Sequence, residues 1–155
     1  MNQHSSNGPN APQDPKLIVV HCMAEYLEYE GKTVHAPDFI NAIGLSAHAF
    51  VCPDGQVIRQ RKDTEGAWHA KGFNTDSLGV EILTEGTWDY GTWLEEIKTP
   101  WCKPVQFYAA AGVVRKWVDR WQITDIKRHS DVDPERKYDP GSGFDWSRFL
   151  QLVNG

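Results

Sequence analysis

The sequence predicts a single α/β domain in which helices flank a central mixed β-sheet. The chain has 155 residues, enough for one domain with its own core. Apolar runs typical of buried strands alternate with segments whose apolar residues recur at helical spacing, which favours a layered α/β structure. A hairpin signal between two of the strands indicates a mixed rather than a purely parallel sheet.

The first half of the chain begins with a polar segment. Residues 1–15 are rich in Asn, Pro, Ser and Gln, so we expect a flexible tail followed by one domain over residues 16–155. KLIVVH is a short apolar run with β-branched residues and predicts a buried strand ending at His21. APDFINAI, with Pro37 early in it, predicts a short helix. SAHAFVCPDGQVIRQR predicts two strands around the turn PDG.

The second half predicts four further elements. SLGVEILTEG predicts a strand, and residues 104–122 predict the longest helix because their apolar side chains fall at helical spacing. DIKRH predicts a short strand ending at His129, and FDWSRFLQLV predicts a closing helix. Two histidines therefore stand at the carboxyl ends of predicted strands, which is where α/β folds place their functional sites.

Composition and charge exclude several classes of function. The net charge is −5 and no basic stripe is present, so nucleic acid is not an expected partner. No apolar run is long enough to span a bilayer. The N-terminus has neither a hydrophobic region nor a cleavage signal, so we expect cytoplasmic synthesis without a signal peptide. The three cysteines are widely spaced and indicate no thiolate metal cluster.

A metal site is the chemistry that the two histidines favour. Neutral imidazoles are common metal ligands, and His21 and His129 can converge if their strands are neighbours. A catalytic zinc site needs a third protein ligand and leaves its fourth position to water. The segment RHSDVDPERKYDPG offers four candidates, and spacing gives the last only a modest advantage: Asp131, Asp133, Glu135 and Asp139.

Two charged residues are candidates for the catalytic steps. Glu81 interrupts the apolar strand LGVEIL, where a carboxylate is either on an exposed edge or held beside a reacting group with a raised pKa. The two-residue period places it on the face opposite Val80 and Ile82. Lys137 stands two residues before Asp139 and could stabilise a developing oxyanion.

The remaining histidines are candidates for support or for substrate contact. His48 lies in the strand SAHAFVC and is either a buried structural residue or part of the binding site. His69, within AWHAKGFN, precedes a loop and is expected to line a groove with Trp68 and Asn74. We interpret these four residues as the substrate-binding group rather than as metal ligands.

Four segments resemble one known family: IVVHC, SAHAFVCPDGQV, AWHAKGFNTDSLGVEIL and RHSDVDPERKYDPGSGFDWSRF. They cover nearly everything from Leu17 to Phe149 and resemble the zinc-dependent N-acetylmuramoyl-L-alanine amidases of type 2, which include phage lysozymes, muropeptide-recycling amidases and peptidoglycan-recognition proteins. The resemblance implies that family's fold, with residues 16–155 as the catalytic domain. It also implies one Zn²⁺ per chain, and a peptidoglycan or muropeptide substrate; we expect a monomer.

The resemblance also implies individual roles. His21, His129 and Asp139 correspond to the zinc ligands, Lys137 to the oxyanion-stabilising residue and Glu81 to the acid/base. Some phage members have a cysteine as third ligand and a tyrosine before the position of His48. Those features are here Asp139 and Ala47, a combination that looks more like the recycling amidases.

Three functions remain open at this point. The short length and the absence of long insertions favour a phage-type endolysin, which would be released to the cell wall by a holin. The alternative is a cytosolic amidase that recycles anhydro-muropeptides. A non-catalytic peptidoglycan-binding module is less favoured, because no zinc ligand is missing.

Overall fold

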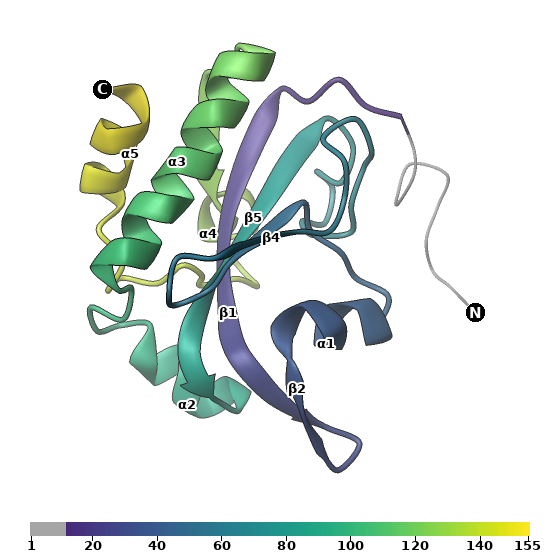
Figure 1. Cartoon of the computed structure of the whole chain (residues 1–155), viewed down its shortest axis with the longest axis vertical. Helices are drawn as coiled ribbons and strands as arrows, with labels where there is room; N and C mark the ends of the chain where they lie inside the picture. Colours follow the sequence, from purple (N-terminus) through teal and green to yellow (C-terminus); the bar gives the residue numbers. More distant parts are fainter. Residues whose placement is uncertain (1–11) are drawn as a thin grey trace.

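The computed structural model describes residues 12–155, which form a six-stranded mixed sheet with helices packed on its two faces (Figure 1). Its elements are, in chain order, β1 (Leu17–Tyr29), β2 (Lys32–His35), α1 (Ala36–Ala42), β3 (Ala49–Val51), β4 (Val57–Arg59), β5 (Ser77–Thr87), α2 (Tyr90–Glu96), α3 (Pro104–Trp121), β6 (Asp125–Arg128), α4 (His129–Val132) and α5 (Trp146–Asn154).

Strand β1 is the centre of the sheet. It pairs in parallel with β5 and with β6, and in antiparallel fashion with β2. On the far side of β5, β3 pairs in parallel with β5, and β4 completes the predicted hairpin by pairing antiparallel to β3. The prediction of a mixed sheet is therefore confirmed.

The two faces of the sheet carry different side chains. Ile18 and Val20 of β1 and Val80 of β5 pack with α3 and α5 in the main core. Because successive strand residues point to opposite faces, His21 and Glu81 project from the other face. Helix α1 covers only part of that second face, whereas α3 and α5 lie together on the first (Figure 1). The second face is where the functional side chains gather.

Strand β1 is longer than the sequence predicted. It continues for eight residues beyond His21 to Tyr29, so this histidine lies within the strand and not at its end. The extension pairs with β2 through a two-residue turn, in which Glu30 and Gly31 have φ of 51° and 78°. Hairpin turns with positive φ at both central residues favour Asn-Gly, and the Glu-Gly pair here gives a weaker signal.

The expected flexible tail of residues 1–15 lies mostly outside the described residues, but its last part is bound to the domain. The side-chain amide of Gln13 donates to the carbonyl oxygens of Asp63 (2.8 Å) and Ser77 (2.9 Å). Its Oε1 accepts a hydrogen bond from the Ser77 backbone N–H at 3.2 Å. The chain from Pro12 onward therefore belongs to the folded structure.

Replacing Gln13 with alanine is expected to lower the free energy of unfolding by about 1–2 kcal/mol, because buried backbone groups of Asp63 and Ser77 lose partners. Urea denaturation measures the change. Asp14→Ala is the matched control, since its side chain is 78% exposed and makes only a surface ion pair with Lys16. Equal midpoints for both variants would contradict the anchoring role of Gln13.

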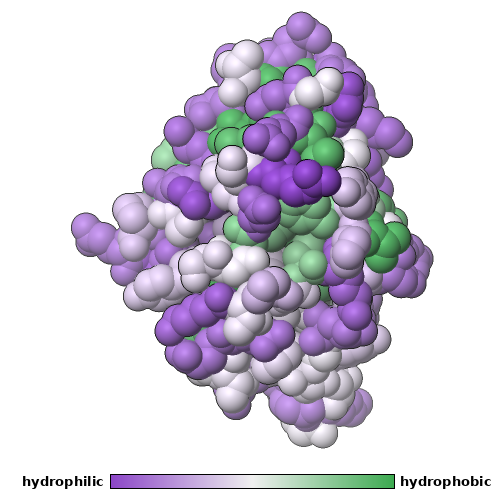
Figure 2. Space-filling model, turned by 90° about the vertical axis from the view of Figure 1, so that its left-hand side faces the viewer, coloured by the Kyte–Doolittle hydropathy of each residue, from purple (hydrophilic) through white to green (hydrophobic). Residues whose placement is uncertain are grey.

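Seen from the side of α2, α3 and α5, the surface is largely hydrophilic, with hydrophobic side chains visible in the upper part, near the middle and at the right-hand edge (Figure 2). Within residues 12–155, no helix combines the length and apolar character that crossing a bilayer requires.

Candidate metal centre

Three side chains from distant parts of the chain meet on the second face of the sheet. His21 lies in β1, and His129 directly follows β6, whose Arg128 pairs with Val20 of β1. This parallel register brings the two imidazoles side by side, with ring centroids 4.3 Å apart. Asp139 joins them from the loop that follows α4. Within residues 12–155, these three form the only such group of potential metal ligands.

The loop after α4 folds back so that its end lies beside its start. The backbone N–H of Ser130 donates to the carbonyl oxygen of Asp139 at 3.1 Å, and the Cys22 N–H donates to Asp139 Oδ2 at 3.2 Å. Asp131, the alternative that spacing left open, instead accepts two side-chain hydrogen bonds from Arg128. The structure thus separates these two carboxylates, which the sequence spacing could not.

The ligand atoms have the spacing of a tetrahedral metal site. The Nδ1 atoms of His21 and His129 are 2.9 Å apart, and they lie 3.6 Å and 3.2 Å from Asp139 Oδ2. Ligands at zinc bonding distances of ~2.0–2.1 Å in a tetrahedron are about 3.3 Å apart. The residues present therefore fit one zinc ion, with three protein ligands on one side of it.

Burial and neighbouring groups shift the pKa values of two of these ligands, His21 and Asp139. Burial and the neighbouring His129 lower the pKa of His21 to about 4, so its imidazole is neutral near pH 7. Burial alone would raise the pKa of Asp139, but hydrogen bonds and charge interactions with the two histidines hold it well below its ordinary value. A ligand set of two imidazoles and one carboxylate would leave a divalent ion with net positive charge.

Glu81 stands next to the metal ligands on the neighbouring strand. It pairs with His21 across β1 and β5, and its Oε2 lies 3.8 Å from His21 Nδ1. Strand β5 lies between β1 and β3, so Glu81 is not on an exposed edge. Burial, followed by the nearby charge of Asp139, raises its pKa well above the ordinary value. Its Oε1 has no hydrogen-bond partner among the described residues, which leaves it available to a ligand.

Three of the four candidates for substrate binding line the same cavity. Trp68, His69 and Asn74 all lie in its wall, and Asn74 Oδ1 accepts hydrogen bonds from the backbone N–H of His69 and of Ala70. The ring of His69 lies directly against Gly79 of β5, where an added Cβ would be 2.5 Å from His69 Nδ1. A side chain at Gly79 would therefore displace His69 from its position.

His48 lies outside the cavity lining, unlike the other three candidates. It is fully buried, and its Nδ1 accepts a hydrogen bond from the backbone N–H of Gly79 at 3.1 Å. Its Nε2 is 2.7 Å from the carbonyl oxygen of Glu65. These contacts connect the start of β3 to β5 and to the loop that contains Glu65. They correspond to a buried structural role for His48 rather than to a place in the binding site.

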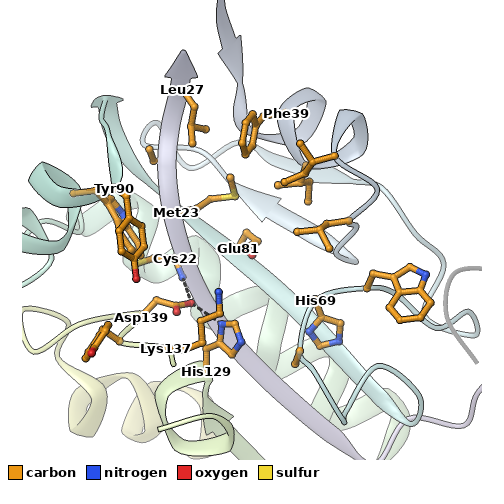
Figure 3. A pocket seen from close by; sticks show the side chains of 18 of the residues that line it. Cys22, Met23, Leu27, Phe39, His69, Glu81, Tyr90, His129, Lys137 and Asp139 are labelled. Carbon is orange, nitrogen blue, oxygen red and sulfur yellow. Dashed lines mark hydrogen bonds and ion pairs between the residues drawn. The ribbon is translucent and has the colours of Figure 1, made fainter. Parts of the chain in front are cut away.

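The cavity has a volume of about 580 Å³, within the range that small-ligand sites occupy. Figure 3 shows Glu81, His129, Lys137 and Asp139 gathered in one part of it. Apolar and aromatic side chains line the rest: Met23, Leu27, Phe39, Ile40, Ile43 and Leu45 from β1, α1 and the loop after α1, and Trp88, Tyr90 and Trp93 from α2 and the residues before it.

Most of this apolar lining was not predicted from the sequence. Met23 and Leu27 lie in the part of β1 that was not predicted, and α2 was not predicted at all. One signal for α2 was available: Asp89 caps the helix by accepting a hydrogen bond from the Thr92 N–H at 2.8 Å. This cap is the main local signal, because the helix itself begins with the weak helix formers Tyr90, Gly91 and Thr92.

Comparisons with known proteins agree with this geometry. The chain is 35% identical over 168 residues to the 1,6-anhydro-N-acetylmuramyl-L-alanine amidase AmpD of Enterobacter cloacae, an alignment that covers 92% of this chain and 83% of that protein. A crystal structure of an AmpD derivative superposes with a TM-score of 0.67 and 26% identity, covering 97% of this chain and 96% of the other.

An amidase named LysC from Clostridium intestinale shares the fold, with a TM-score of 0.72 and 23% identity over 99% of this chain and 95% of its own. The family described as N-acetylmuramoyl-L-alanine amidase (Amidase_2) matches residues 11–142, which include all three clustered ligands, Glu81 and Lys137. The chain therefore belongs to the N-acetylmuramoyl-L-alanine amidase family and is a peptidoglycan amidase.

Proposed function

We propose that this amidase is zinc-dependent and that it cleaves small soluble muropeptides, of the 1,6-anhydro-N-acetylmuramyl-L-alanine type, rather than the intact wall. The single observation that carries the zinc dependence is the convergence of His21, His129 and Asp139 beside Glu81 in one cavity. The substrate size is supported by the AmpD relative, which is 35% identical and aligns over most of both chains. This favours the recycling alternative over the endolysin that chain length first suggested.

The bond to be cleaved joins the lactyl carbonyl of N-acetylmuramic acid to the nitrogen of L-alanine. His21, His129 and Asp139 would hold the zinc ion. Bound zinc supplies Lewis acidity, which makes a water molecule more acidic and a carbonyl carbon more electrophilic. Because burial lowers the pKa of His21 to about 4, its imidazole retains near pH 7 the lone pair that would hold the ion.

Glu81 is the proton carrier of the proposed reaction. Glu81 lines the cavity and its Oε1 has no hydrogen-bond partner among the described residues, so the carboxylate can accept the proton of the attacking water. It can then deliver this proton to the departing nitrogen of L-alanine. A raised pKa suits this double role, since a carboxyl group that gives back its proton near neutral pH must hold it long enough to transfer it.

Lys137 is the proposed partner of the oxyanion that forms on the lactyl carbonyl. Replacing it with alanine is expected to lower kcat about 10²–10³-fold, which corresponds to ~2.7–4 kcal/mol of transition-state stabilisation, while the zinc content stays at one per chain. Steady-state kinetics with parallel metal analysis measures both. Lys127→Ala is the control, because Lys127 is exposed in β6 and pairs with Asp125. Unchanged kcat in the Lys137 variant would remove this residue from the mechanism.

The substrate proposal is tested by comparing two substrates with the same enzyme. We expect efficient release of the peptide from soluble 1,6-anhydro-muropeptides, little solubilisation of purified sacculi, and loss of activity after treatment with a chelator. Mass spectrometry of the products identifies the cleaved bond. Faster turnover of sacculi than of soluble fragments would support the endolysin and overturn the recycling proposal.

A further inference from the structure

A chain of hydrogen bonds leads away from the metal centre into the protein. His21 Nε2, on the opposite side of the ring from the Asp139 contact, lies 2.9 Å from His69 Nδ1. His69 Nε2 lies 2.9 Å from Ser77 Oγ. The Ser77 hydroxyl in turn donates to the backbone carbonyl oxygen of Phe73. Each histidine thus uses both ring nitrogens.

The far end of this chain sets the direction of every hydrogen bond in it. A carbonyl oxygen only accepts, so the Ser77 hydroxyl hydrogen is used on Phe73, and Ser77 Oγ accepts the Nε2–H of His69. A neutral imidazole carries one ring hydrogen, so His69 Nδ1 is bare and accepts from the Nε2–H of His21. His21 Nδ1 is then bare as well, and this is the atom that faces His129 and Asp139.

One hydrogen on each ring satisfies every contact along this chain of hydrogen bonds. The space for the His69 ring is provided by Gly79, the residue at which any side chain would collide with it. The strand is therefore built to accommodate this ring beside His21.

We propose that His69 is a positioning residue: backed by Ser77 and the Phe73 carbonyl, it keeps the ring hydrogen of His21 on Nε2 and presents the bare Nδ1 to the metal ion. The inference rests on the proposed zinc dependence and deepens it. It assigns His69 to the metal centre rather than to substrate contact, although its ring also borders the cavity. Partners that orient a ligating histidine in this way are usually carboxylates or carbonyls, and here the partner is a second imidazole.

The decisive comparison is between three substitutions of His69 in the full chain, with zinc affinity measured by competition with a chromogenic chelator. His69→Phe keeps a ring but has no acceptor, and we expect its zinc dissociation constant to rise about 10–100-fold. His69→Asn places an amide oxygen near the position of Nδ1 and should recover most of the affinity. His69→Gln reaches toward Ser77 instead and should not.

A spectroscopic measurement tests the same point without zinc. In the chelator-treated wild type at neutral pH, long-range ¹H–¹⁵N correlation spectra distinguish a protonated ring nitrogen from a bare one. We expect His21 to be protonated at Nε2 and bare at Nδ1, and we expect a mixture of the two forms in Ser77→Ala and His69→Phe. If His69→Phe does not fold, the spectra of the wild type and of Ser77→Ala still provide the comparison.

His48→Asn is the matched control, since His48 is fully buried, contacts Gly79 from the residue just before β3, and makes no hydrogen bond to His21. It should lower stability but leave the zinc affinity of the folded protein unchanged. Wild-type affinity in His69→Phe, or the same loss in all three His69 variants and in His48→Asn, would overturn the positioning role while leaving the proposed function intact. A wild type that binds no zinc would overturn both.

Discussion

Asp139→Asn is expected to lose both zinc and amidase activity, to below the limit of detection. Asparagine keeps the size of the side chain and can still accept the hydrogen bond from the Cys22 N–H, so the loop should retain its path. It lacks the negative charge that lies 3.2 Å and 3.6 Å from the two imidazole Nδ1 atoms, and a divalent ion would then be held by neutral groups alone. Metal analysis and a peptide-release assay measure the two losses.

Asp131→Asn is the matched control for this prediction. It carries the same substitution in the same segment, at the carboxylate that sequence spacing could not distinguish from Asp139. In the structure Asp131 is engaged by Arg128 and lies outside the ligand group, so zinc content and activity should be those of the wild type. If the Asp131 variant lost its zinc and the Asp139 variant kept it, the assignment of the third ligand would be wrong.

Glu81→Gln is expected to lower kcat about 10²–10⁴-fold, the range usual for loss of a general acid–base group. Glutamine is nearly isosteric and fits the same space in β5, but it cannot accept a proton from water and return it to the leaving nitrogen. Since Glu81 Oε2 lies 3.8 Å from His21 Nδ1, outside the ligand group, the zinc content should remain at one per chain. Single-turnover kinetics with a soluble muropeptide measures the chemical step.

Glu85→Gln provides the comparison on the same strand. Glu85 is exposed near the end of β5, and its carboxylate forms an ion pair with Lys103 at 3.0 Å. It lies four residues beyond Glu81 and is not part of the ligand group. We expect normal turnover in this variant. A Glu81 variant that turned over as fast as the Glu85 variant would exclude Glu81 as the proton carrier and direct attention to another group in the cavity.

The parts of the fold that the sequence predicted are those with a strong local signal. The apolar run before His21, the hairpin around PDG, the strand with Glu81 and the long helix after Pro104 each have a clear period or turn. The continuation of β1 to Tyr29 and strand β2 were missed, because those segments are half exposed and their strand structure depends on pairing with each other.

The residue types of the site could be predicted from the sequence, but the contacts between these residues could not. Periodicity placed Glu81 on the face opposite Val80, and this placement is confirmed. The choice between Asp139 and Asp131 depended on how a proline-containing loop folds back, which residue spacing does not encode. The contact of His69 with His21 depends on the absence of a side chain at Gly79, and only the three-dimensional packing of the loop on β5 reveals it.

The proposed reaction requires one ion bound by His21, from the first strand, and by His129 and Asp139, from a segment more than 100 residues later. Anomalous diffraction at the zinc absorption edge, from crystals of the protein purified with zinc, tests it most directly. We predict a single peak at ~2.0–2.2 Å from Nδ1 of His21, Nδ1 of His129 and a carboxylate oxygen of Asp139, with the fourth position open to the cavity. A map without a peak between these atoms, or with a fourth protein side chain filling the open position, would contradict the proposed mechanism.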